Sequence, residues 1–405
     1  MTSAVPDRVP TGQRLKYLDG IRALAAMYVF VHHAFMTAYP VRLTGEIEGW
    51  VGRVLGWALW GHFGVTVFIV LAGYSLTLGL ANLDGELPGG LIGFVKRRTL
   101  RIAPPYWAAL GLAVVLTTTY IGKPSGTHWD QSLPTGPKDW AVNAVLLQDL
   151  FPITNTAYPF WSVAVEYHIY LLLPIILLVW RWSNWGVAVG AGAVFGIVGI
   201  LAGQLIDDRI DRLYPEYYLL FSLAVAACVA KNRITEAVSR VPWLVISLCL
   251  AGSVVALIST HSYVWVTERN NWLDLVVGLA AISLILALET GRAPRSARVL
   301  SWKPLAGIAV FSYSLYLVHA PLLQVFWQLA VRPLSFSREG QLAMLWLVGV
   351  PVILGISYGF YRLFEKPFVP KPRLRPSVRD ARTTSTQEPT PTVQRPFPLN
   401  PGRPG

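Results

Sequence analysis

The sequence predicts an all-α membrane protein, a polytopic bundle of about ten transmembrane helices with both termini in the cytoplasm. Three observations lead to this fold class. Only 14% of the 405 residues are charged, whereas a soluble domain carries about a quarter. The mean hydropathy is +0.47, which favours lipid as the main solvent. The apolar residues also form long runs that are separated by short basic clusters.

Ten of these runs have the length of about 20 residues that a helix needs to cross the hydrocarbon layer. They are 18–39, 57–80, 104–122, 158–180, 184–205, 213–230, 241–259, 271–290, 305–330 and 341–364. A weaker apolar stretch from Trp140 to Phe151 is too short to cross. We expect it to lie at the outer surface or to re-enter the bundle.

The basic residues predict the orientation of the chain. If the N-terminus is cytoplasmic, 25 of the 34 Lys and Arg residues fall on the inner side and nine on the outer side. Since positive loops remain in the cytoplasm, this orientation is the favoured one. The net charge of +12 is therefore a topology signal, and no nucleic-acid partner is expected.

The chain is predicted to divide into a transmembrane domain, 1–368, and a cytoplasmic tail, 369–405. The tail holds nine prolines and seven basic residues without apolar periodicity. Such a segment cannot bury enough apolar surface to offset the entropy lost on ordering, so it is predicted to be disordered. Its basic start either contacts anionic headgroups or is simply solvated.

Ionisable residues inside the predicted spans need a partner or a purpose. In the first span Arg22 and His33 are eleven positions apart, which places them on one helix face about 16 Å apart along the axis. Arg22 then lies at the cytoplasmic end and His33 lies deep in the membrane. The alternative is a structural histidine and an arginine that only anchors the interface.

Arg98 and Arg101 follow the second span and project to the same side of a helical turn. Two guanidinium groups on one face suit a polyanion such as phosphate. A plain topology determinant is the competing interpretation.

Glu166 lies about two turns into the fourth span, at a depth comparable with that of His33. A carboxylate at that depth must pair or be protonated. A His–Glu pair would be a general-base arrangement, in which the carboxylate orients the ring. A structural tie to an arginine or a tyrosine is equally compatible.

The ninth span carries a polar stripe at helical spacing, which predicts a lined cavity rather than a lipid-facing surface. The stripe consists of Ser312, Tyr316 and His319, and Tyr313, Tyr316 and His319 are predicted to line the cavity. Whether His319 takes part in chemistry or only tethers helices is open from the sequence. Glu365 at the end of the tenth span is expected to pair with inner-side arginines.

Together these segments resemble the bacterial acyltransferase family 3, integral membrane enzymes that O-acylate carbohydrates and glycosylated metabolites. The likeness covers residues 14–368. It rests on five motifs in the right order: Leu18 to Ala25 followed by His33, Arg98-x-x-Arg101, Trp161 to Glu166, Ser312 to His319, and Tyr361 to Phe368.

The sequence departs from the family pattern at several positions. Thr66 and Ala72 stand where the family commonly has Asp and Ser, and Tyr167 and His168 replace its Glu-Gln pair after Glu166. Because His33 and Glu166 are kept, activity is still expected.

The resemblance implies an acyl-CoA-dependent O-acyltransferase of the bacterial plasma membrane. Its partners would be acyl-CoA, preferentially acetyl-CoA, as co-substrate, a carbohydrate or glycosylated small molecule as acceptor, and the lipid bilayer. Arg22, Arg98 and Arg101 would bind acyl-CoA. His33 would act as general base or accept the acyl group transiently, and Glu166 would orient His33 or bind the acceptor. No metal and no permanently bound cofactor are expected.

A proton-coupled transporter or flippase of a sugar-containing or lipid substrate is the rival function. Intramembrane His, Glu and Arg residues are also what such carriers require. Against this reading, the sequence shows no repeat of one half in the other and no paired interrupted spans. A non-catalytic scaffold would leave the ionisable residues without a role.

Overall fold

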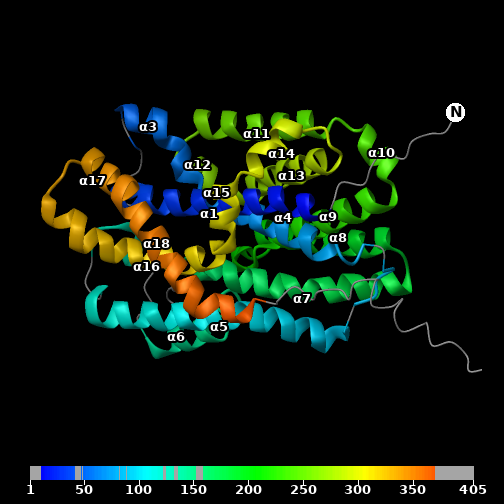
Figure 1. Cartoon of the computed structure of the whole chain (residues 1–405), viewed down its shortest axis with the longest axis horizontal. Helices are drawn as coiled ribbons and strands as arrows, with labels where there is room; N and C mark the ends of the chain where they lie inside the picture. The colour runs from blue at the N-terminus through cyan, green and yellow to red at the C-terminus, as the bar shows by residue number, and fades with distance from the viewer. Residues whose placement is uncertain are drawn as a thin grey trace, which may run out of the picture. The chain divides into compact units, whose positions relative to one another are not determined.

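A computed structural model describes residues 11–41, 47, 49–81, 83–87, 89–121, 125–131, 136–151 and 158–369. Within these ranges the chain is helical and contains no β-strand, which confirms the predicted fold class (Figure 1). The helices are α1 (Thr11–Ala38), α3 (Gly49–Leu55), α4 (Phe63–Thr77), α5 (Gly90–Leu116), α6 (Pro137–Ala144), α7 (Trp161–Trp182), α8 (Trp185–Leu205), α9 (Pro215–Arg233), α10 (Thr235–Arg240), α11 (Trp243–Thr260), α12 (Tyr263–Thr267), α13 (Asn270–Glu289), α14 (Pro294–Leu300), α15 (Lys303–Val310), α16 (Ser312–Phe326), α17 (Arg338–Met344) and α18 (Val350–Phe360).

Nine helical segments in the described part of the chain are long and apolar enough to cross a membrane. They correspond to nine of the ten predicted spans. The tenth, 213–230, forms α9, which is 19 residues long and carries Glu216, Lys231 and Arg233. This helix packs against α4, α8 and α13, and Glu216 and Lys231 are buried in the protein, whereas Arg233 at the end of the helix is exposed. Helix α9 therefore lies inside the bundle, where the apolarity that lipid demands is not needed.

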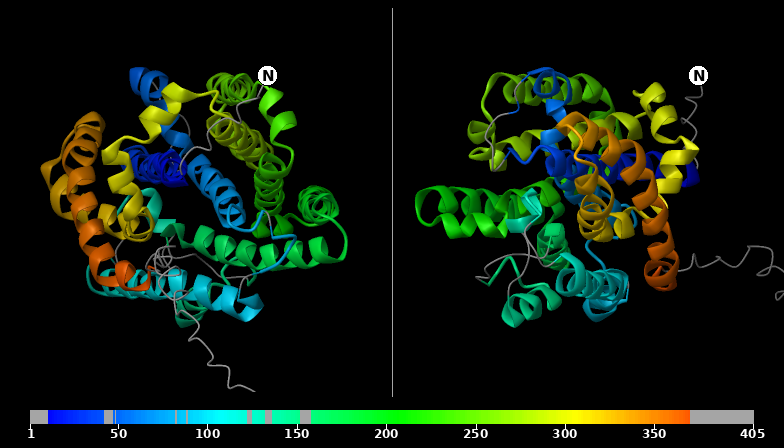
Figure 2. Two further views of the ribbon diagram at one scale, coloured as in Figure 1. Left: turned by 45° about the vertical axis from the view of Figure 1, so that its right-hand side comes forward. Right: turned by 90° about the vertical axis from the view of Figure 1, so that its left-hand side faces the viewer.

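Helix α1 runs through the middle of the bundle and packs against α4, α15 and α16 (Figures 1 and 2). Helix α4 in turn lies between α1 and α9. A Cβ atom built on Gly64 would lie 2.7 Å from the carbonyl oxygen of Ala25, and one on Gly73 would lie 2.7 Å from that of Phe221. These glycines let α4 approach both neighbours closely, as small residues do between membrane helices.

Two predicted boundaries were wrong in an informative way. The third span was predicted to begin at residue 104, but α5 begins at Gly90 and continues through Pro104 and Pro105. Arg98 and Arg101 therefore lie on a helix and not in a loop. The ninth predicted span is divided at Phe311, whose φ of −118° and ψ of 17° end α15 before α16 begins.

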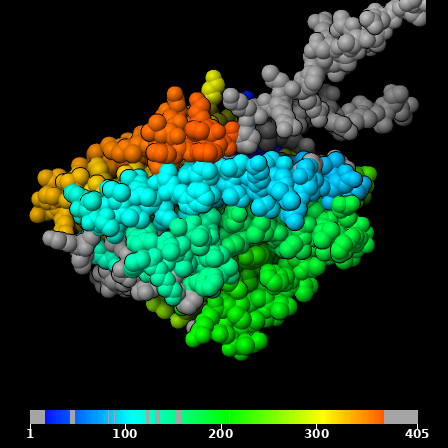
Figure 3. Space-filling model, turned by 90° about the horizontal axis from the view of Figure 1, so that it is seen from below, coloured from blue at the N-terminus to red at the C-terminus, as the bar shows by residue number. Residues whose placement is uncertain are grey.

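The outer helices of the bundle present apolar side chains to their surroundings. Helix α11 is an example, since only 11% of its most apolar window is buried in the protein. Cys228 is buried in α9, whereas Cys249 on α11 is exposed. Figure 3 shows one face of this surface, crossed by α5 with α6, α7 and α8 beside it.

The short stretch between Trp140 and Phe151 forms the end of α6 and a series of turns, and it does not cross the bundle. It is tied to α5 because Asn143 and Ala144 accept hydrogen bonds from Tyr106 (2.7 Å) and Trp107 (2.8 Å) through their carbonyl oxygens. The predicted tail, 369–405, lies outside the described residues apart from Val369. The cytoplasmic placement of the termini stays a prediction.

Candidate active site

Two of the cavities formed by the described residues are lined in part by α1. Arg22 near its start lines a cavity of ≈ 290 Å³, which we call the inner cavity. His32 and His33 in its second half line a cavity of ≈ 680 Å³, which we call the outer cavity. Arg22 and His33, which were predicted to share one face of the helix, thus line two different cavities.

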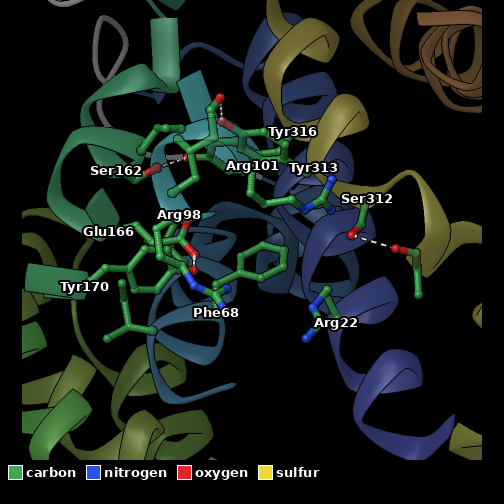
Figure 4. Close-up of a pocket in the computed structure, with 15 residues that line it drawn as sticks. Arg22, Phe68, Arg98, Arg101, Ser162, Glu166, Tyr170, Ser312, Tyr313 and Tyr316 are labelled. Atoms are coloured by element: carbon green, nitrogen blue, oxygen red, sulfur yellow. Dashed lines mark hydrogen bonds between the residues drawn. The ribbon is translucent and has the colours of Figure 1, made fainter. Parts of the chain in front are cut away.

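Three arginines from two helices converge on the inner cavity (Figure 4). Arg22 comes from α1, and Arg98 and Arg101 come from α5, on the same side of that helix as the i, i+3 spacing predicted. Glu166 is the one carboxylate among the lining residues, while Asp19 and Glu365 pair with Arg22 and Arg101 at 2.7 Å from outside the lining. The three guanidinium groups together offer a cluster of donors that suits an anionic ligand such as phosphate.

Part of the arginine donor capacity is not used by the protein. Nε of Arg98 and one terminal nitrogen of Arg101 are buried and have no hydrogen-bond partner among the described residues. The guanidinium of Arg98 lies over the rings of Phe94 (5.6 Å) and Tyr170 (5.9 Å), which hold it in place. Because a buried donor without an acceptor is costly, these groups are suited to receive acceptor oxygens from a ligand.

Arg101 also has a structural role. Its other terminal nitrogen lies 2.7 Å from Oε1 of Glu365, whose side chain is 0% exposed. The second oxygen of Glu365 accepts hydrogen bonds from the backbone N–H (3.0 Å) and the hydroxyl (2.5 Å) of Ser314. The pairing of Glu365 with an inner-side arginine is the one that the sequence led us to expect, and it ties the end of the chain to α5 and α16.

Glu166 lies among the arginines and not beside His33. Its carboxylate accepts a hydrogen bond from Tyr170, one turn further along α7, and both residues line the inner cavity (Figure 4). No hydrogen bond joins Glu166 to His33 among the residues that the structure describes. The acid–base pair considered from the sequence is therefore not formed, because α7 directs this carboxylate toward the inner cavity.

The partner of His33 is instead His319 of α16. Nδ1 of His33 lies 2.7 Å from Nε2 of His319, and the two rings are nearly parallel, at 13°. His319 is 1% exposed, and its Nδ1 lies 3.0 Å from the carbonyl oxygen of Leu315. It was predicted to line a cavity, but it lies behind His33 and belongs to the lining of neither cavity.

This arrangement assigns the protons on both neutral rings. A carbonyl oxygen only accepts, so Nδ1 of His319 must carry a proton and its Nε2 must be the acceptor. Nδ1 of His33 then donates to His319, and the lone pair of His33 is left on Nε2. The inference is that Nε2 is the basic nitrogen of His33, held in this tautomer by His319.

Tyr316 and Ser162 stand where the two cavities approach each other. The Tyr316 hydroxyl donates to the carbonyl oxygen of Pro159 (3.0 Å) and is hydrogen-bonded to the hydroxyl of Ser162. Tyr316 and Ser162 line the inner cavity, whereas Pro159 lines the outer one. Tyr313, also predicted as cavity-lining, lies in the inner cavity and donates to the carbonyl oxygen of Ile102 (3.0 Å).

The outer cavity contains ionisable residues that sequence reasoning missed. Asp274 on α13 accepts a hydrogen bond from Thr66, the residue that stands where the family commonly has Asp. A carboxylate is thus present beside that position, but it comes from another helix. Glu216 and Asp274 both lie in predicted spans, so the rule that singled out Glu166 could have found them as well.

The comparison with known proteins shows to which family the chain belongs. Residues 15–362 match the acyltransferase domain of acyltransferase family 3. The chain belongs to this family. Its members are polytopic membrane proteins, in agreement with the helices described above.

Among the curated proteins, the chain is similar to several O-acetyltransferases. It is 25% identical to the peptidoglycan O-acetyltransferase OatA of Listeria monocytogenes over 76% of this chain and 49% of that protein. It is 26% identical to the O-acetyltransferase OatA of Staphylococcus aureus over 86% of this chain and 56% of that protein. The chain thus spans about half the length of these relatives. No solved structure matches it.

Proposed function

We propose that the chain is a membrane O-acyltransferase that moves an acyl group, in the first instance acetyl, from acyl-CoA to a hydroxyl of a carbohydrate or glycosylated metabolite. The observation that carries the proposal is the tautomer of His33. His319 fixes this tautomer at the wall of the outer cavity, and the same helix, α1, places Arg22 in the inner cavity. Family membership and the names of the relatives support acetyl transfer to a carbohydrate.

The inner cavity is the proposed donor site. A coenzyme A thioester carries several phosphate oxygens and a long, thin arm. The phosphates would accept hydrogen bonds from Arg98 and Arg101, whose buried N–H groups lack partners in the described protein. Arg22 would add a third positive charge along the route. Glu166, held by Tyr170, is assigned to this donor site rather than to the base.

His33 is the proposed general base. Nε2 would take the proton of the acceptor hydroxyl while that oxygen attacks the carbonyl carbon of the thioester. The bond between the carbonyl carbon and sulfur then breaks, and the leaving coenzyme A thiolate takes the proton that Nε2 of His33 had accepted. General-base catalysis of this kind contributes about 10²–10⁴-fold. His319 is a positioning residue in this scheme, because it acts only through His33.

The test uses the full chain purified in lipid nanodiscs with radiolabelled acetyl-CoA and a panel of methyl glycosides and solubilised peptidoglycan fragments. We expect label to move to a glycan in the unmodified protein. His33→Ala should remain folded and inserted but transfer no label. His261→Ala is the matched control, since His261 is exposed, stacks on Trp265 and lines neither cavity.

The same experiment separates the enzyme from the rival transporter. An enzyme consumes the thioester and forms a labelled ester, whereas a carrier leaves the thioester intact and only moves solute. Transfer by His33→Ala at the normal rate would refute the assigned base. Absence of thioester consumption by the unmodified chain with every acceptor would refute acyl-CoA as the donor.

A further inference from the structure

We infer that Tyr316 closes the passage between the two cavities, and that it thereby decides whether the thioester reacts with an acceptor or with water. This inference rests on the proposed function, because it concerns how a donor held by the arginines reaches the base at His33. The linings of the two cavities and the hydrogen bonds between them support it.

The two cavities have separate linings. Among the described residues, none lines both of them. Pro159 and Trp161 at the start of α7 line the outer cavity, whereas the next two residues, Ser162 and Val163, line the inner one. Reacting atoms must approach to about 3–3.5 Å. A thioester bound in the inner cavity therefore reaches an acceptor hydroxyl beside His33 only when this division opens.

Hydrogen bonds between α16 and the start of α7 hold the division closed. The Tyr316 hydroxyl donates to the carbonyl oxygen of Pro159 (3.0 Å) and is hydrogen-bonded to the hydroxyl of Ser162. Oγ of Ser162 also lies 3.2 Å from the same carbonyl oxygen. Both side chains are buried. The hydroxyl of a residue that lines the inner cavity is thus bound to a backbone atom of a residue that lines the outer one.

The ring of Tyr316 lies between the inner cavity and the histidine pair. Its centroid is 6.1 Å from that of Phe68, which lines the inner cavity, and 5.7 Å from that of His319, the partner of His33. Figure 4 shows Tyr316 in the upper part of the inner cavity and Arg22 in the lower part. The ring therefore stands on the way from the arginines to the base.

The backbone on either side of Pro159 is anchored. Tyr158 donates a hydrogen bond to Gln324 of α16 (2.9 Å), and the carbonyl oxygen of Phe160 accepts one from Gln148 (3.0 Å). The φ of Tyr158 is 52°, a value that is uncommon for a residue with a Cβ atom and that persists only where the surroundings fix it. A rotation of the facing side chains therefore opens the division more readily than a shift of this backbone.

A closed passage keeps water in the outer cavity away from the thioester. Water competes with the acceptor, since its oxygen can also attack the carbonyl carbon while Nε2 of His33 takes one of its protons. The carbon–sulfur bond then breaks, the proton passes to the thiolate, and the products are acetic acid and coenzyme A. Enzymes prevent such side reactions by excluding water. Removal of the Tyr316 hydroxyl or ring should therefore increase hydrolysis.

The experiment measures the hydrolysis of radiolabelled acetyl-CoA by the full chain in nanodiscs without any acceptor. We expect Tyr316→Ala, which lacks the ring, to hydrolyse acetyl-CoA at least tenfold faster than the unmodified chain. Tyr316→Phe, which keeps the ring and loses both hydrogen bonds, should hydrolyse it at least threefold faster. A variant that is merely destabilised loses activity, so a gain of hydrolysis separates this role from a purely structural one.

Tyr358→Phe is the matched control, because Tyr358 is 45% exposed on α18 and lines neither cavity. It should leave hydrolysis unchanged. Since Tyr316→Phe preserves the volume of the ring, it tests the inference even if the alanine variant fails to fold. Hydrolysis by Tyr316→Phe at the rate of the unmodified chain, or an equal gain in Tyr358→Phe, would overturn the inference.

A labelling experiment needs no acyl transfer and separates this inference from the proposed function. Ser312 lines the inner cavity, so Ser312→Cys places a thiol there. Cys249 is exposed and is replaced by serine, whereas Cys228 is buried and stays. In membrane vesicles of either orientation, a membrane-impermeant methanethiosulfonate reagent should label the new thiol from one face of the membrane only. Addition of Tyr316→Ala should allow labelling from both faces.

The two failures then have different signatures. If the labelling follows this pattern but no acetyl-CoA is consumed with any acceptor, only the acyltransferase proposal fails. If acetyl groups are transferred and the thiol is labelled from both faces with Tyr316 in place, only the closed passage fails.

Discussion

Replacement of His319 by leucine is the sharpest test of how the site works. His319 is 1% exposed and accepts the hydrogen bond from Nδ1 of His33 at 2.7 Å. Leucine has a similar volume but no acceptor, so the variant leaves Nδ1–H without its partner and removes the group that selects the tautomer. The bundle keeps its packing, because the substituted side chain remains apolar and buried.

The magnitude follows from the hydrogen bond that is lost. A buried donor without a partner costs about 1–3 kcal/mol, which corresponds to a fall in kcat of about 5- to 150-fold. The upper limit is the whole general-base contribution of about 10²–10⁴-fold. KM for acetyl-CoA should not change, since His319 does not line the inner cavity.

The assay is the rate of coenzyme A thiol release against acetyl-CoA concentration, with the Tm of each variant measured in the same detergent. His319→Gln is the matched variant, because its amide oxygen can occupy the place of Nε2 and accept the same hydrogen bond. We expect glutamine to restore most of kcat. Normal kcat in the leucine variant, or an equal loss in both variants at unchanged Tm, would refute the tautomer argument.

Three further outcomes follow from the structure. Arg98→Gln should raise KM for acetyl-CoA by about 10- to 150-fold with little change in kcat, because it removes a charge-assisted hydrogen bond worth about 1.5–3 kcal/mol. Arg101→Gln should raise KM similarly and also lower Tm, since it disturbs the 2.7 Å pair with buried Glu365; an unchanged Tm would argue against that structural role. Gly20→Ala should cost about 1–3 kcal/mol of stability, because its Cβ would lie 1.9 Å from a carbonyl oxygen of α14, whereas Gly252→Ala, with nothing within 4 Å, should not destabilise. Thermal melts of both glycine variants check this.

The sequence was informative about the inner cavity because the signals for its residues are local. The i, i+3 spacing of Arg98 and Arg101 fixes their common side on any helix, and both line the inner cavity. Glu365 was likewise expected to pair with an arginine, and it pairs with Arg101. Local periodicity decides which side of a helix a residue occupies, and for these residues nothing more was needed.

The sequence was less informative about which ionisable groups meet. Glu166 and His33 have similar depths, which made a pair plausible, but depth does not determine how a helix is rotated about its axis. The packing of α7 turns Glu166 toward Tyr170 and the arginines, and the packing of α16 brings His319 to His33 instead. Asp274 beside Thr66 is a similar case, since the two residues are 208 positions apart.

The sequence by itself therefore determined the fold class, nine of the ten spans, the family and the helix face shared by Arg22 and His33. These properties depend on hydrophobic length and on periodicity within one helix. Only the tertiary structure decided that His319 fixes the tautomer of His33, that Glu166 belongs with the arginines, and that two different cavities meet α1. The physical reason is that helix rotation and interhelical contacts are set by packing between segments distant in the chain, about which the pattern within one segment carries no information.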